Sequence, residues 1–121
     1  MPDYRSLAVW DRAYALTLAV YRVSQGYPKV EMFALASQTR RAATSIAANI
    51  AEGAGRDSDR DFARFLAIAV GSSNELEVEL RLARDLGYLP NEKWTFLFSE
   101  LSQIRSMLTR LRQRLLADSK R

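Results

Sequence analysis

Apolar side chains recur every three or four residues along four stretches of the chain, the spacing of helices that each bury one face. This pattern predicts helices over about residues 7–25, 32–54, 58–86 and 91–117. Glycine, tyrosine and proline follow the first and third stretches, and such residues end helices. No stretch alternates apolar and polar residues with a period of two, so no strand is predicted.

Within the last three stretches, the positions expected to face the core alternate in spacing between four and three, which is typical of a left-handed bundle. In the second stretch they are Leu35, Thr39, Ala42, Ile46, Asn49 and Gly53. In the third they are Phe62, Leu66, Ala69, Ser73, Leu76, Leu80 and Ala83. In the fourth they are Leu97, Leu101, Ile104, Leu108, Leu111 and Leu115. Short links between four such helices predict an all-α, up-down-up-down antiparallel four-helix bundle, one domain over residues 1–121.

Two residues depart from an ordinary helical pattern. Asn49 is polar at a core position, and an unsatisfied amide there would cost about 1 to 3 kcal/mol. We interpret it as a core residue that fixes helix register, with a ligand contact as the alternative. Gly71 costs about 1 kcal/mol relative to alanine in mid-helix. It therefore indicates a closely packed backbone, for which the alanine-rich face of the second helix is the expected neighbour.

The second and third helices lack a fully polar side. Residues 42–51 carry no charge, and residues 62–70 are apolar nearly all round. Phe65, Ile68 and Val70 lie away from the predicted core positions, and a helix without a polar face is normally buried on more than one side. The sequence therefore predicts a homo-oligomer in which these two helices supply much of the interface.

Composition narrows the function classes. The 121 residues are 48% hydrophobic and 26% charged, as in a globular domain, and they include neither cysteine nor histidine. Thiolate nucleophiles, disulfides and the usual zinc ligands are thereby excluded. The first residues do not resemble a signal peptide, and no charge-free run approaches membrane-spanning length. We expect a cytoplasmic protein without a membrane partner.

Carboxylates offer two candidate sites. Asp57, Asp59 and Asp61 copy the start of a calcium loop, but Phe62 replaces the required glycine and Ile68 the bidentate glutamate. With Ser58, these residues resemble a capping box instead.

Glu75, Glu77 and Glu79 crowd one turn and could hold a metal or perform acid-base chemistry. The interpretation we favour is a helix ion pair from Glu77 to Arg81, together with salt links to neighbouring arginines. We expect no metal, no cofactor and no enzymatic activity.

Basic residues give the remaining functional signal. The formal net charge is +4, and arginines are concentrated near the second helix and along the fourth. Guanidinium groups bind phosphates bidentately, and an oligomer would multiply any such patch. The candidate nucleic-acid-binding residues are Arg40, Arg41, Arg56, Arg60 and Arg64. The alternative is a scaffold whose arginine-rich surface docks a protein such as a reverse transcriptase or other polymerase.

A longer motif carries a family resemblance. It runs Gln38-x-Arg40-Arg41-Ala42-x-x-Ser45-Ile46-x-x-Asn49-Ile50-Ala51-Glu52-Gly53, with Trp10-x-x-Ala13 before it and Phe62-x-x-Phe65-Leu66-x-x-Ala69-x-Gly71-Ser72-x-x-Glu75-Leu76 after it. The chain resembles the four-helix-bundle proteins encoded in intervening sequences of bacterial 23S ribosomal RNA genes. This family includes the accessory variability determinant of diversity-generating retroelements, a basic protein that associates with a reverse transcriptase and nucleic acid. The resemblance implies a homo-oligomeric bundle, with relatives pointing to a pentamer, and RNA or DNA as partners.

Overall fold

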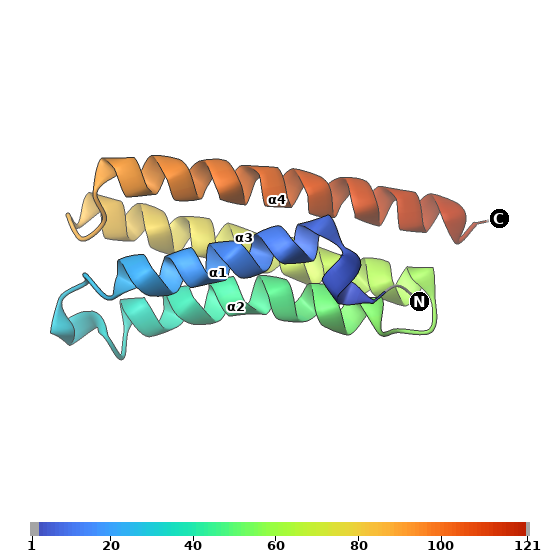
Figure 1. The fold of residues 1–121 in the computed structure, drawn as a ribbon, viewed down its shortest axis with the longest axis horizontal. Helices are drawn as coiled ribbons and strands as arrows, with labels where there is room; N and C mark the ends of the chain where they lie inside the picture. The colour runs from blue at the N-terminus through green and yellow to red at the C-terminus, as the bar shows by residue number, and fades with distance from the viewer. Residues whose placement is uncertain (1–2, 121) are drawn as a thin grey trace.

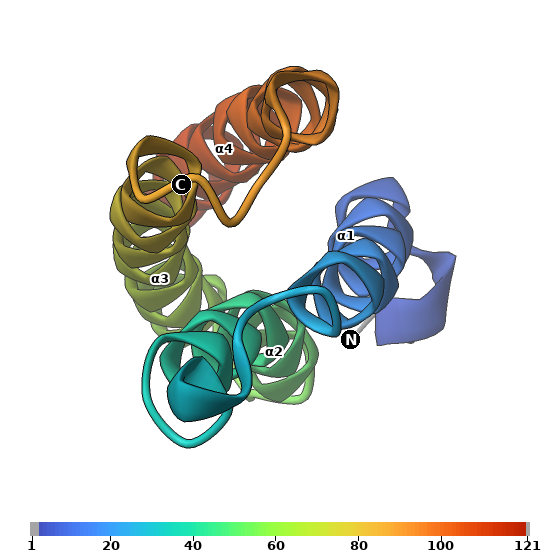
Figure 2. The ribbon, with the colours of Figure 1, turned by 90° about the vertical axis from the view of Figure 1, so that its left-hand side faces the viewer.

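The computed structural model describes residues 3–120, which form a bundle of four long helices. The helices are α1 (Ala8–Ser24), α2 (Leu35–Ala54), α3 (Asp59–Asp85) and α4 (Asn91–Asp118), with short 3₁₀ helices η1 (Tyr4–Ser6) and η2 (Lys29–Glu31). The links from α1 to α2 and from α3 to α4 lie at one end of the long axis, and the turn from α2 to α3 lies at the other (Figure 1). Seen along the axis, the helices follow one another in order around the core (Figure 2). No strand occurs within the described residues.

The predicted core positions are nearly all buried, which confirms the three-and-four spacing. Every predicted position of α3 is buried, as are Leu97, Leu101, Ile104 and Leu108 of α4. Leu111 and Leu115, nearer the end of α4, are only partly buried. The α2 positions are buried too, except Asn49, which is half-buried. The core therefore thins toward the last turns of α4.

The predicted start of the second helix is wrong by three residues. We expected it at Met32, but α2 begins at Leu35, after η2 and a bend at Ala34 with φ −124° and ψ −103°. The Gln38 amide donates to the Ala34 carbonyl at 3.0 Å, so helical bonding starts only there. The bend leaves Phe33 98% exposed.

The close backbone approach occurs at a different glycine from the one predicted. A Cβ on Gly71 would meet nothing within 4 Å, so the expected packing of α2 against it is wrong within the chain. A Cβ on Gly53 would instead lie 2.8 Å from both Phe62 Cδ1 and Phe65 Cβ. A close α2–α3 contact is therefore found at Gly53, beside their connecting turn.

The sequence features that predicted the helix ends are confirmed at some ends and not at others. Ser58 Oγ accepts a hydrogen bond from the Asp61 amide at 3.1 Å, as the capping box predicts. Gly87 has φ +81° at the end of α3, a conformation in which glycine avoids strain. Gly26 does not use that conformation. No helix within residues 3–120 is both long and apolar enough to cross a membrane.

Candidate nucleic-acid interface

Arg40 is largely occupied by contacts with the end of α1. Its Nε donates to Ser24 Oγ at 2.7 Å, and its Nη2 donates to the Tyr21 carbonyl at 3.3 Å. The guanidinium carbon also lies 5.0 Å from the centre of the Tyr21 ring. Such bonds satisfy a helix carbonyl and orient α2 against α1, and they leave less of Arg40 for an outside phosphate.

Arg41 points away from the core and is exposed. It has no ion-pair partner within the described chain. Arg41 lines a surface pocket of about 420 Å³ together with Gln38, Ser45 and Glu75. Of the two neighbouring arginines at the start of α2, Arg41 is the one available to a ligand.

Arg56 and Arg64 share two neighbours at the α2–α3 turn. Both guanidinium carbons lie 4.5 Å from the centre of the Phe65 ring. Arg64 pairs with Asp61 at 2.9 Å, and Arg56 pairs with Glu52 at 2.7 Å and more distantly with Asp61 at 3.8 Å. These half-exposed pairs hold the turn together, so a phosphate would have to compete with two carboxylates.

Arg60 lies near these residues but is exposed without an ion-pair partner among residues 3–120. The five predicted residues do not form one patch. Arg40 and Arg56 are 16 positions apart, which corresponds to roughly 24 Å along the bundle at 1.5 Å per helical residue. Two groups result, Arg40 with Arg41 and Arg56 with Arg60 and Arg64.

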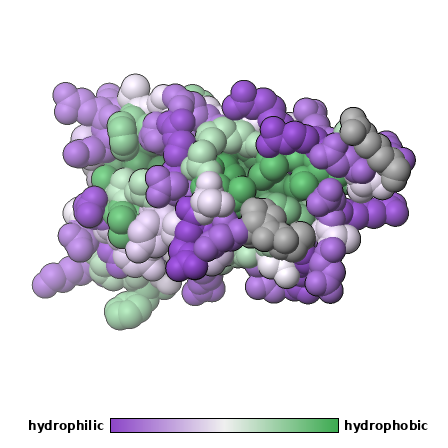
Figure 3. Space-filling model, turned by 45° about the vertical axis from the view of Figure 1, so that its right-hand side comes forward, coloured by the Kyte–Doolittle hydropathy of each residue, from purple (hydrophilic) through white to green (hydrophobic). Residues whose placement is uncertain are grey.

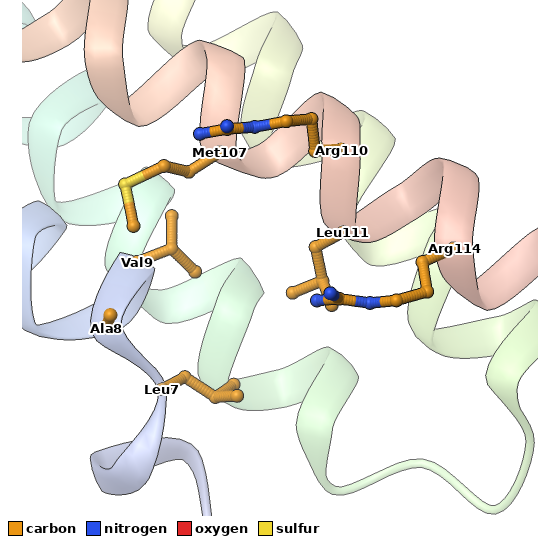
Figure 4. A pocket seen from close by; sticks show the side chains of 7 residues that line it. All are labelled: Leu7, Ala8, Val9, Met107, Arg110, Leu111 and Arg114. Atoms are coloured by element: carbon orange, nitrogen blue, oxygen red, sulfur yellow. The ribbon is translucent and has the colours of Figure 1, made fainter.

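Sequence reasoning did not select Arg110 and Arg114 of α4, which border a pocket between the start of α1 and the second half of α4. Its volume is about 280 Å³, and it is lined by Leu7, Ala8, Val9, Met107, Arg110, Leu111 and Arg114. Figure 4 shows both arginine side chains extending along the pocket, opposite Leu7 and Val9. In Figure 3, a broad apolar area framed by hydrophilic side chains covers this part of the surface. The sequence does contain a sign that Arg110 lacks a helix ion pair, because no acidic residue lies three or four positions from it.

The glutamate cluster divides into two environments. Glu77 accepts from Arg105 at 2.6 Å and from Arg81 at 3.2 Å, as the predicted ion pair and salt links require. The Arg105 hydrogen bond holds the pKa of Glu77 below its usual range. Within residues 3–120, no group of three potential ligands is placed to hold a metal ion.

Glu79 differs from the salt-linked surface carboxylate that we predicted. It is only 8% exposed, and its Oε1 has no hydrogen-bond partner in the described chain. Burial, reinforced by the neighbouring Glu75 carboxylate, raises the pKa of Glu79 to about 7. Burial of the Tyr27 side chain, with the Glu79 charge nearby, raises the pKa of the Tyr27 hydroxyl to about 12.

Asn49 has internal partners, which supports the structural interpretation. Its Nδ2 donates to the Ser45 carbonyl at 2.8 Å and to Ser45 Oγ at 3.0 Å. Ser45 Oγ in turn hydrogen-bonds to Ser72 Oγ across the α2–α3 contact at 2.8 Å. The three side chains form a polar link between the helices, although Asn49 is half-buried and not enclosed as predicted.

The fold and its charged surface define a small four-helix protein with several exposed arginines. The profile of the 23S rRNA-intervening sequence protein family matches residues 5–110. The chain belongs to this family, as its motifs predict. Comparison with curated proteins gives no match.

A solved structure supports the same assignment. The chain is similar to a protein of unknown function from the S23 ribosomal protein family of Bacteroides thetaiotaomicron, whose crystal structure was determined at 1.70 Å. The two are 26% identical, the match covers 84% of this chain and 94% of the other, and the TM-score is 0.77. The likeness extends over most of both chains, so it describes the whole bundle.

Proposed function

We propose that this protein is a non-enzymatic, nucleic-acid-associated protein, most simply RNA-binding, that acts as a homo-oligomer of up-down-up-down bundles. Arginine contacts to phosphates, summed over the copies, would provide the affinity. Such binding reads the charge of the backbone and carries little sequence information. The family name is consistent with an RNA setting, and exposed arginines are the physical basis for binding.

The observation that carries the proposal is a set of exposed arginines without carboxylate partners. Arg41 and Arg60 have none within 4 Å among the described residues, and neither do Arg110 and Arg114. An unpaired guanidinium can accept a phosphate without first losing an ion pair. Arg41 and Arg60 are therefore the strongest of the five candidates, while Arg40, Arg56 and Arg64 have competing contacts.

A protein scaffold remains the second candidate, because exposed apolar residues accompany the arginines. Tyr14, Leu18 and Tyr21 of α1 are 40% to 49% exposed, and aromatic and arginine side chains are enriched in protein interfaces. A partner of the polymerase class would then be recovered as a stoichiometric complex, while free nucleic acid would bind poorly.

Fluorescence anisotropy with labelled RNA hairpins, single-stranded RNA and duplex DNA tests the proposal. Titrations at about 50 and about 200 mM salt should differ by orders of magnitude in affinity if several phosphates are contacted. In the double variant Arg41→Gln, Arg60→Gln, the affinity should fall, and the salt slope for single strands should decrease by about 1.4 per chain in contact.

The double variant Arg5→Gln, Arg22→Gln removes the same charge from other exposed positions and is the matched control. Equal losses in the two double variants would show a general charge effect and would reject Arg41 and Arg60 as the site. No binding by the wild type at low salt would favour the scaffold.

A further inference from the structure

Phe33, just before α2, is an aromatic side chain that the fold leaves in solvent. It is 98% exposed, more than any other large hydrophobic residue between residues 3 and 120. By contrast, Phe65, which the sequence places away from the core positions of α3, is buried beneath the guanidinium groups of Arg56 and Arg64. Packing of the core therefore gives no reason for an aromatic residue at position 33.

The backbone around Phe33 is hydrogen-bonded on both sides of the residue. The Met32 amide donates to the Lys29 carbonyl at 3.1 Å, and the Ala34 amide donates to the Glu31 carbonyl at 3.1 Å. The Glu31 carboxylate in turn accepts a hydrogen bond from the Tyr88 hydroxyl at 3.0 Å, which ties this segment to the end of α3. The exposed ring is thus carried by a segment whose backbone position is fixed.

Phe33 lines a surface pocket between the end of α1 and the start of α2, which we call the Phe33 pocket. Tyr21, Met32 and Phe33 supply its aromatic and apolar surface, and Ser37, Arg40 and Arg41 border it with polar groups. The volume is about 410 Å³. Pockets that bind small molecules span about 300 to 1,000 Å³, so the Phe33 pocket is large enough for one such ligand.

The charge of the Phe33 pocket is positive. Arg41 is exposed and has no ion-pair partner within 4 Å in the described chain. Arg40 is held at the pocket wall by its hydrogen bond to Ser24 Oγ at 2.7 Å, and its guanidinium carbon lies 5.0 Å from the centre of the Tyr21 ring. None of the described residues that line the pocket is acidic. The pocket therefore favours an anionic ligand.

An open phenyl ring next to a free guanidinium group matches the chemistry of a nucleotide. Every nucleobase has a π face that stacks on aromatic side chains, and it is joined through the sugar to a phosphate that arginine can bind. Proteins that bind single strands combine these two kinds of contact. Because Phe33 is almost fully exposed, its ring is open to a planar partner, and Arg41 lines the same pocket.

We propose that the Phe33 pocket binds an unpaired base of single-stranded RNA, which stacks on Phe33 while an adjacent phosphate pairs with Arg41. This inference rests on the proposed function and adds the form of nucleic acid that is bound. Bases within a duplex are already stacked on one another, so a duplex offers this pocket only its phosphates. Single strands and hairpin loops should bind more tightly than duplexes, with little preference among bases because stacking is sequence-tolerant.

The variant Phe33→Ala removes the stacking surface and no charge. The side chain is 98% exposed, so the variant should fold, which circular dichroism melting verifies. By fluorescence anisotropy, its affinity for labelled single-stranded oligoadenylate should fall about 5- to 150-fold, the range for the loss of one stacked base. Its affinity for a blunt RNA duplex of equal length, and its salt slope, should stay those of the wild type, since no phosphate contact is lost.

Three further variants separate stacking from general apolar contact. Phe33→Tyr keeps an aromatic ring and should keep the wild-type affinity for oligoadenylate. Phe33→Leu keeps apolar bulk without a ring and should lose affinity as Phe33→Ala does. Phe96→Ala is the matched control, because Phe96 is a 58% exposed phenylalanine on α4 that does not line the pocket, and it should bind as the wild type does.

Tryptophan fluorescence reports the stacking directly. In Phe33→Trp, oligoadenylate should quench the added indole as a base stacks on it, whereas a contact made only to phosphates would leave the indole unchanged. Phe96→Trp adds an indole outside the pocket and should show no such quenching. Trp10 and Trp94 give the same background in both variants.

The outcomes separate this inference from the function on which it rests. Wild-type affinity for oligoadenylate in Phe33→Ala or Phe33→Leu, an equal loss in Phe96→Ala, or an unquenched Phe33→Trp would overturn the stacking site. If the wild type nevertheless binds RNA with a steep salt dependence, the phosphate-binding function stands and this inference alone is wrong. If the wild type binds neither single strands nor duplexes at about 50 mM salt, where phosphate contacts are strong, both are wrong and a protein partner becomes the expected occupant of the pocket.

Discussion

The α2–α3 contact and the α1–α4 contact close the same bundle in different ways. Small residues bring α2 and α3 together, since Gly53 lies against Phe62 and Phe65, and Ser45 reaches Ser72 at 2.8 Å. Between the start of α1 and the end of α4, a pocket of about 280 Å³ remains. The view along the axis shows the wider separation of α1 from α4 (Figure 2). Stability should therefore depend unequally on the two sides.

The largest difference should appear when equivalent apolar side chains are truncated on the two sides. Ile46 of α2 is fully buried, so Ile46→Ala should lower the free energy of unfolding by about 2 to 5 kcal/mol. Leu111 of α4 is only partly buried beside the pocket, and Leu111→Ala should cost clearly less, about 1 kcal/mol. Urea unfolding of the two variants measures this. Equal losses would mean that the pocket side is as tightly packed as the α2–α3 side.

A smaller effect is expected from adding one methyl group to each helix glycine. In Gly53→Ala the new Cβ would lie 2.8 Å from Phe62 Cδ1 and Phe65 Cβ, so the variant should lose about 1 to 3 kcal/mol through overpacking. In Gly71→Ala the new Cβ meets nothing within 4 Å, and helix propensity should raise the stability by about 0.5 to 1 kcal/mol.

Thermal and urea unfolding of both glycine variants beside the wild type measure these two effects. A stabilised Gly53→Ala variant would show that α2 and α3 can separate at their turn without cost. That result would remove the main distinction between the two contacts.

The sequence predicted the buried faces because apolar spacing depends only on helix geometry. Phe62, Leu66 and Leu76 fall on the core side of α3 wherever its exact ends lie. The start of α2 was missed because Ala34 bends the chain without glycine or proline to mark the bend. The choice between Gly53 and Gly71 depends on how α2 and α3 are rotated about their axes, which spacing alone does not determine.

The candidate site was predictable in residue type but not in arrangement. The excess of arginine is visible in the sequence, whereas the contacts that occupy Arg40 involve Ser24 and Tyr21, sixteen and nineteen positions away. The burial of Glu79 was also missed, since a glutamate four positions from Glu75 ordinarily lies in solvent. The contacts of Arg40 and the burial of Glu79 both depend on residues that are distant in the sequence, and no local sequence pattern predicts such contacts.

The last comparison sets a buried carboxylate of α3 against a partly exposed carboxylate of the α1–α4 side, and its outcome depends on pH. Burial raises the pKa of Glu79 to about 7, well above its ordinary value of 4.5, so the folded chain binds this proton more tightly than the unfolded chain does. The free energy of unfolding should therefore decrease as pH rises from about 5 to about 8. Glu79→Gln cannot ionise, so its stability should lie within about 1 kcal/mol of the wild type near pH 5 and exceed it by about 3 kcal/mol near pH 8, since each pKa unit corresponds to about 1.4 kcal/mol. Glu100→Gln breaks the partly exposed Arg12–Glu100 pair of the α1–α4 side, and it should cost under about 1 kcal/mol at both pH values. Urea unfolding at the two pH values separates these outcomes, and a Glu79→Gln variant that is no more stable than the wild type at the higher pH would mean that Glu79 is well solvated when charged.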